Sequence, residues 1–120
     1  MIELGTISVK NAETFSDARR KIFRLTEALA YDAMDATRLV AAFSELLRTD
    51  VRDIFDVDVA IGLEDRDGRI GLTLRFSYGQ NESIASQGAP IFDVFDVGNG
   101  EGSAPKVLAF KYLSNPGFTP

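Results

Sequence analysis

The spacing of hydrophobic residues predicts two helices in the first half of the chain. Between residues 14 and 30 the apolar side chains recur every three or four positions and would share one helix face: Phe15, Ala18, Ile22, Leu25 and Leu29. From Ala33 to Thr49 the same rule holds more regularly, with Ala36, Leu39, Val40, Phe43, Leu46 and Leu47. Residues suited to helix starts precede or open both runs, namely Asn11 or Ser16 for the first and Asp32 and Asp35 for the second.

The spacing then changes to strict alternation, which is typical of half-buried strands. Every second residue is apolar from Phe55 to Leu63 and again from Ile70 to Phe76, on either side of an Asp65–Gly68 turn. Two alternating runs around an Asp-Gly pair predict a β-hairpin. A shorter strand is expected over Gly5–Lys10. One apolar and one polar face per strand indicate an antiparallel sheet that is covered on one side only.

The last third of the chain has a weaker pattern. Five of the ten glycines in the whole chain lie between Tyr78 and Gly102, so Gln80–Gly102 is expected to be the most mobile segment. Within it, residues 91–97 are apolar and fit an edge strand, a helical turn or a lid. Ser103-Ala-Pro-Lys resembles a helix start, and a helix through Leu113 is expected. The fold class is therefore α+β, a two-layer sandwich with helices on one face of a mostly antiparallel sheet of three to five strands.

The amino-acid composition excludes several classes of function but does not identify one. The chain has neither cysteine nor histidine, which excludes thiol catalysis, zinc–thiolate sites and a Ser-His-Asp triad. Its net charge of −5 argues against binding nucleic acid. No apolar run approaches the roughly 18 residues that a membrane helix needs, and the N-terminus lacks a signal-peptide stretch. We expect a single cytoplasmic domain over residues 1–120, without nucleic-acid or membrane partners.

Local motifs offer only weak sites by themselves. The Asp65–Gly68 segment has too few acids for a calcium loop and is interpreted as a turn, and no metal site is expected. The acidic residues around Asp56 and Asp58 suit a solvated sheet face. The basic residues of the first helix (Arg19, Arg20, Lys21 and Arg24) suit a solvated face or an anionic partner. Gly98–Ser103 could cradle a phosphate at a helix start, although a linker with a cap explains it better.

One longer pattern carries more weight. Ala18-Arg19 in the first helix, Ala36-Thr37-Arg38 at the start of the second and Ser44-Glu45-Leu46-Leu47-Arg48-Thr49 at its end precede the hairpin. Over residues 7–77 this order resembles the GHKL superfamily of histidine-kinase-like ATPases. Its closest likeness is to the branch of anti-sigma-factor serine kinases. The resemblance implies a Bergerat-like sandwich, truncated relative to the full family domain.

The resemblance also implies where a nucleotide would bind. In that family the helix glutamate, here Glu45, acts on the attacking water or hydroxyl, and an asparagine four residues later holds Mg²⁺. Here Thr49 takes the asparagine position, and Ser77 takes that of the aspartate that reads adenine. The degenerate nucleotide-binding set is Glu45, Arg48, Thr49, Ser77, Gly79, Gly98, Gly100 and Gly102. Mg-ATP is therefore expected to bind weakly at best, and no cofactor is expected.

These expectations favour a regulatory or protein-interaction module in bacterial signal transduction, the N-terminal part of a longer signalling protein. Its partner would be another protein or a fused signalling domain. One alternative is an active ATP-dependent serine kinase with Glu45 as catalytic residue, and another is a structural or dimerisation domain without ligand. Weak, salt-sensitive self-association is expected unless residues 91–97 join the interface.

Overall fold

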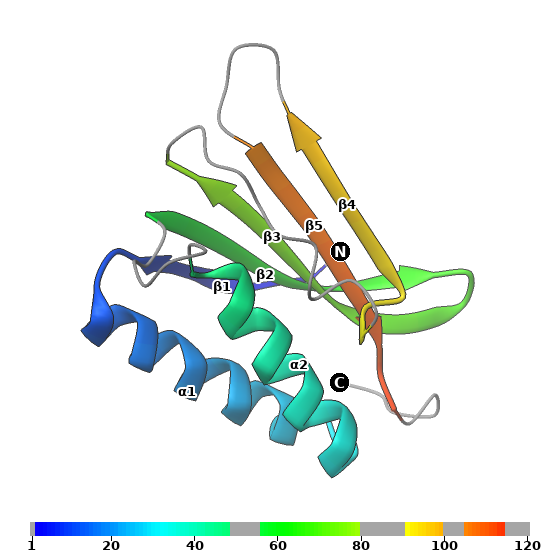
Figure 1. Ribbon diagram of the computed structural model, residues 1–120. Helices are drawn as coiled ribbons and strands as arrows, with labels where there is room; N and C mark the ends of the chain where they lie inside the picture. Colours follow the sequence, from blue (N-terminus) through cyan, green and yellow to red (C-terminus); the bar gives the residue numbers. More distant parts are fainter. Residues whose placement is uncertain (1, 49–55, 80–90, 100–104, 115–120) are drawn as a thin grey trace.

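A computed structural model describes residues 2–48, 56–79, 91–99 and 105–114 of the chain. It contains a five-stranded antiparallel sheet and two helices, which confirms the α+β sandwich (Figure 1). In chain order the elements are β1 (Ile2–Val9), α1 (Ala12–Ala28), α2 (Ala33–Leu46), β2 (Val57–Arg66), β3 (Arg69–Tyr78), β4 (Val94–Asn99) and β5 (Pro105–Tyr112). The strand order across the sheet is β1-β2-β3-β5-β4, so β1 and β4 form its two edges.

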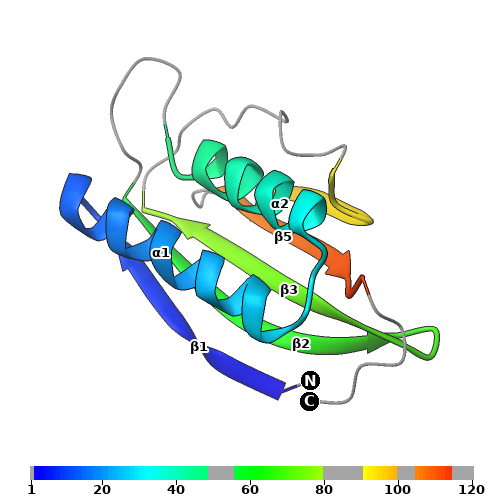
Figure 2. The same ribbon diagram turned by 90° about the horizontal axis from the view of Figure 1, so that it is seen from below.

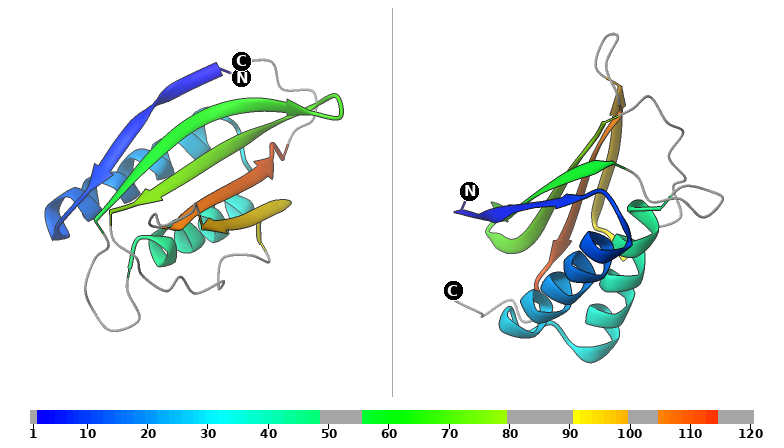
Figure 3. Two further views of the ribbon diagram at one scale, coloured as in Figure 1. Left: turned by 90° about the horizontal axis from the view of Figure 1, so that it is seen from above. Right: turned by 90° about the vertical axis from the view of Figure 1, so that its left-hand side faces the viewer.

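Both helices lie on one face of the sheet, and no other described helix or strand covers the opposite face (Figures 2 and 3). The alternation of the strands produces this division. Val59 of β2 pairs with Phe76 of β3, and both side chains are buried on the helix side. The residues next to them in sequence, Ala60 and Arg75, also pair with each other, but their side chains lie on the opposite face and are exposed. We call these two sides the helix face and the open face.

The helices follow the predicted apolar stripes closely. Ala18 and Ile22 of α1 are fully buried, as are Leu39 and Phe43 of α2. Of the two caps considered for the first helix, Asn11 is the one used. Its side chain accepts a 2.9 Å hydrogen bond from the Thr14 N–H, and the Thr14 hydroxyl accepts one from the Asn11 N–H, which completes a capping box.

The predicted hairpin is confirmed as β2 and β3. Asp67 and Gly68 both have positive φ, 56° and 83°, the backbone conformation of a two-residue turn that matches the twist of paired strands. The Asp65 carboxylate accepts a 3.0 Å hydrogen bond from the Gly68 N–H. These observations support the interpretation of this segment as a turn. β1 begins at Ile2, earlier than predicted. Its register shifts between Glu3 and Gly5, and this bulge interrupts the alternation on which the prediction depended.

The prediction of a helix from Ser103 to Leu113 is wrong, because Pro105–Tyr112 forms the strand β5. The apolar run from Val107 to Phe110 is buried on both sides of the sheet. Val107 and Ala109 lie on the helix face, and Phe110 is buried on the open face. A short continuous apolar run of this kind does not distinguish a strand from a helix by its spacing. Of the three structures considered for residues 91–97, the edge strand is correct over Val94–Asn99. Residues 80–90 and 100–104, most of the segment expected to be mobile, lie outside the described residues.

Candidate functional site

Glu45 and Arg48 lie at the C-terminal end of α2, where the resemblance places them. Both side chains are exposed. The Arg48 guanidinium lies 5.4 Å from the centre of the Phe15 ring of α1, and Arg19 lies 5.9 Å from the same ring. Cation–π contacts of this kind pack Arg48 against the neighbouring helix. Thr49, which the resemblance assigns to the metal-binding position of the family, lies outside the described residues.

The end of β3 is attached directly to this end of α2. The Tyr78 hydroxyl donates a 2.6 Å hydrogen bond to the carbonyl of Leu46, the last residue of α2. The next residue, Gly79, donates a 2.7 Å hydrogen bond from its N–H to the carbonyl of Asp56, which immediately precedes β2. Tyr78 is buried, and burial raises the pKa of its phenol well above the ordinary value. Tyr78 therefore fixes the distance between α2 and β3 as a neutral hydrogen-bond donor.

Ser77, which the resemblance assigns to the adenine-reading position of the family, lies on the opposite face of the sheet from Tyr78. It precedes Tyr78 in β3 and pairs with Asp58 on one side and Lys106 on the other, on the open face. Since successive side chains of a strand point to opposite faces, Ser77 and Tyr78 lie on opposite faces of the sheet. The sheet therefore separates Ser77 from Glu45. Glu45 and Arg48 are neighbours at the end of α2, where the Arg48 N–H donates a 3.2 Å hydrogen bond to the Glu45 carbonyl, and Ser77 lies on the other side of the sheet.

Gly98 belongs to the open-face group. It pairs with Lys106, which in turn pairs with Ser77, so the three residues form one row across β4, β5 and β3. Both interpretations of Gly98–Ser103, the preferred helix cap and the phosphate cradle, required a helix to begin after Gly102, and the strand β5 follows there instead. A helix dipole is therefore not available to bind phosphate at this place. Gly100 and Gly102 lie outside the described residues.

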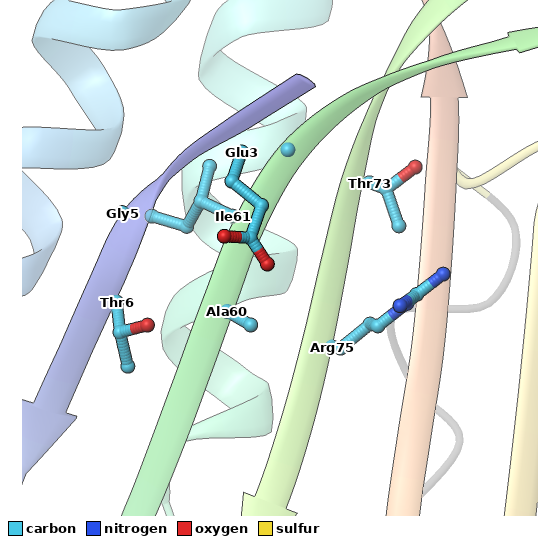
Figure 4. A pocket seen from close by; sticks show the side chains of 8 residues that line it. Glu3, Gly5, Thr6, Ala60, Ile61, Thr73 and Arg75 are labelled. Atoms are coloured by element: carbon cyan, nitrogen blue, oxygen red, sulfur yellow. The ribbon is translucent and has the colours of Figure 1, made fainter. Parts of the chain in front are cut away.

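A hollow of about 550 Å³ lies over this part of the open face. Side chains of both charges surround it, together with apolar and small residues: Ala60, Arg75, Ser77, Asp96, Gly98, Lys106 and Leu108. A second hollow of about 80 Å³ adjoins it over β1 and β2. Figure 4 shows Arg75 extending from β3 towards β5, while Glu3 extends from β1 across β2. Within the described part of the chain, neither Arg75 nor Lys106 forms an ion pair.

The far end of the open face is filled by an aromatic cluster that the sequence did not reveal. The Phe110 ring is fully buried there, with the Arg66 guanidinium 5.0 Å from its centre and Tyr112 edge-on at 4.9 Å. Thr73 is also buried and donates a 3.0 Å hydrogen bond to the Glu64 carboxylate. The available signal was Gly71, a glycine inside a strand, which often marks a close approach by another group.

The charged stretches identified in the sequence form small local contacts. Asp58 accepts a 2.6 Å hydrogen bond from the Ser8 hydroxyl, and Asp56 lies 3.9 Å from the Lys10 amine. On α1, Arg20 pairs with Asp17 at 3.3 Å, and its side chain is mostly exposed. Among the residues that the structure describes, no three acidic side chains gather as metal ligands would. Neither of the two helices in the described part of the chain is long and apolar enough to cross a membrane.

Comparison with known proteins adds no family to this picture. No model of a protein family matches the chain, and no curated protein matches it in sequence.

Proposed function

We propose that the chain is a degenerate histidine-kinase-like ATPase domain that acts as a regulatory or protein-interaction module in bacterial signal transduction. The observation that supports this proposal is the separation of Ser77 from Glu45 by the sheet. A nucleotide held near Glu45 on the helix face could not also contact Ser77 on the open face. Losing a base contact and a metal ligand would each weaken binding by about 1–3 kcal/mol. The domain would then act by binding a partner protein through its surface and would not catalyse phosphoryl transfer.

The open face supplies a surface that suits such a role. Its hollow presents the exposed cations Arg75 and Lys106 beside the exposed carboxylate Asp96. Non-obligate interfaces are about as polar as ordinary protein surface, and their charged residues govern partner choice and encounter rate. A face of mixed charge therefore suits a protein partner better than it suits a nucleotide.

Isothermal titration with Mg-ATP and Mg-ADP tests the proposal. We expect no measurable heat, or dissociation constants of about 1 mM or weaker. The matched control is Glu45→Gln, an exposed substitution that would leave the titration unchanged. A dissociation constant in the low micromolar range, lost or altered in Glu45→Gln, would contradict the proposal and favour the active serine kinase instead.

A further inference from the structure

Among the described residues, the outer edge of β4 has backbone groups without a strand partner, and these fit another strand. In the described part of the chain β4 pairs with β5 on one side and with no strand on the other. The opposite edge, β1, carries a bulge between Glu3 and Gly5, a feature that disrupts pairing with further strands. β4 has no comparable break in its register over Val94–Asn99. It is therefore the edge better suited to pairing.

The hydrogen bonding of β5 shows which residues of β4 face outwards. The Phe110 carbonyl accepts a 2.8 Å hydrogen bond from the Asp93 N–H, so Phe110 directs its backbone groups towards β4. In an antiparallel strand the backbone N–H and C=O groups of every second residue point towards the same neighbouring strand, so those of Leu108 and Lys106 also point towards β4. Their register partners Val94, Asp96 and Gly98 face β5. The N–H and C=O groups of Phe95 and Val97 consequently point away from the sheet.

The side chains at this edge are apolar on the helix face. Val97 is 50% exposed, one of the few large apolar side chains in the described residues with that much exposure. Phe95 is half-buried and stacks on Phe92 with the ring centres 5.9 Å apart. Apolar residues beside unpaired backbone groups favour the addition of a strand from another chain.

We propose that a second copy of this chain pairs with β4 in antiparallel fashion, about a two-fold axis at Val97, to form a ten-stranded sheet. Two-fold dimers are the commonest assemblies, and their contacts must be self-complementary. Val97 would pair with its own copy through two backbone hydrogen bonds. The partner would thus be a second copy of the same chain. The proposal goes beyond the regulatory function because the dimer interface does not depend on whether the chain binds a nucleotide.

Charge selects this register among those that the backbone allows. An axis at Asp96 would oppose two carboxylates directly, which destabilises a strand pair. An axis at Val97 places Asp96 opposite Gly98 of the partner subunit. Beyond that glycine, which has no side chain to intervene, lies Lys106, about two strand spacings or 10 Å away between Cα atoms. Neither Asp96 nor Lys106 forms an ion pair with another described residue. The dimer would therefore gain two reciprocal Lys106–Asp96 pairs.

Sedimentation equilibrium of the chain and of Val97→Lys tests the interface. We expect the unaltered chain to dimerise, and Val97→Lys to raise the dissociation constant at least tenfold by opposing two cations on the axis. Leu4→Lys is the matched control, because Leu4 is 43% exposed on the other edge strand. A chain that stays monomeric at the highest attainable concentration would overturn the proposal. So would a dimer that Leu4→Lys disrupts and Val97→Lys leaves intact.

The register is tested by charge reversal and by cross-linking. Lys106→Asp alone should weaken the dimer, and adding Asp96→Lys should restore it. The chain has no cysteine, so Val97→Cys introduces a single thiol. Directly opposed residues of a hydrogen-bonded pair lie about 5.5 Å apart between Cα atoms, a distance that a disulfide spans. We expect Val97→Cys to form a disulfide-linked dimer under mild oxidation and Asp96→Cys to do so much more slowly. Faster cross-linking of Asp96→Cys, or no rescue by the double reversal, would overturn the Val97 axis.

Discussion

The Tyr78 hydroxyl donates a 2.6 Å hydrogen bond to the carbonyl oxygen of Leu46, and this bond joins the end of β3 to the end of α2. The last carbonyls of a helix have no partner within the helix and need one elsewhere. Tyr78 is buried, so water cannot readily replace it there. The sheet thereby satisfies a helix terminus and sets where Glu45 and Arg48 lie relative to β3.

Replacing this tyrosine should destabilise the chain measurably. Tyr78→Phe leaves the Leu46 carbonyl buried without that donor, which costs about 1–3 kcal/mol of unfolding free energy. Urea denaturation followed by circular dichroism measures the change. Tyr112→Phe is the matched control, because Tyr112 packs edge-on against Phe110 and under Arg69 through its ring. Equal losses in the two variants would show that the Leu46 bond contributes nothing specific.

Stability should also fall in alkaline solution. Burial raises the pKa of both Tyr78 and Tyr31, whose hydroxyl donates a 2.7 Å hydrogen bond to the Lys111 carbonyl. In the unfolded chain a tyrosine ionises near pH 10, while the folded chain keeps both phenols protonated to higher pH. Their contribution is therefore complete below about pH 10 and is lost as the pH rises towards the folded-state pKa.

The measurement is the urea midpoint as a function of pH from neutrality to the alkaline range. We expect a decline that begins near pH 10 and becomes shallower in Tyr31→Phe and in Tyr78→Phe. The two variants differ from the unaltered chain by one phenol each, so the comparison with them identifies the tyrosine contribution. An identical slope in the unaltered chain and in both variants would refute it.

The elements with a single buried face were predictable, and the element buried on both faces was not. The hairpin followed from alternation around Asp67-Gly68, and the helices from apolar stripes with Ile22 or Phe43 at their centres. β5 was mistaken for a helix because Ser103 and Pro105 fit a helix start and no alternation followed them. The alternation is missing because Phe110 is buried on the open face, where a polar residue is expected. Only a neighbouring strand with Gly71 at the right register makes room for that ring. Such a cross-strand fit is invisible in a local window of sequence.

The positions of the candidate site residues follow the same division between faces. The resemblance placed Glu45 and Arg48 at the end of the second helix, and they lie at and just after the end of α2. It grouped Ser77 with them, although the alternation already assigned Ser77 to the polar face. The face on which a strand residue lies is set by its position in the alternation. Closeness in sequence to other candidate site residues does not change that face.

The position of Ser77 leads to a prediction about restoring nucleotide binding. Ser77→Asp supplies the carboxylate that the family pattern requires, but on the open face between Asp58 and Lys106. We expect it to give no gain in affinity for Mg-ATP by isothermal titration. Ser8→Asp is a control for added charge, because Ser8 lies on the same face in β1 and contacts Asp58. A gain of tenfold or more in Ser77→Asp alone would mean that a nucleotide binds from the open face.

The close packing of Gly71 against Phe110 gives the sharpest prediction for stability. A Cβ atom at Gly71 would lie 2.3 Å from Phe110 Cζ and 2.7 Å from the Lys111 carbonyl oxygen, so Gly71→Ala should cost about 1–3 kcal/mol or more. Gly98→Ala is the matched control, because a Cβ there would meet nothing within 4 Å and should be nearly neutral. Trimming the ring with Phe110→Leu should relieve only part of the Gly71→Ala strain, since the Lys111 carbonyl belongs to the backbone and remains. Urea unfolding of the two single glycine variants, of Phe110→Leu and of the Gly71→Ala/Phe110→Leu double variant at low protein concentration measures these differences. Equal stability of Gly71→Ala and Gly98→Ala would show that β3 and β5 separate easily, and that the aromatic cluster does not hold the open face together.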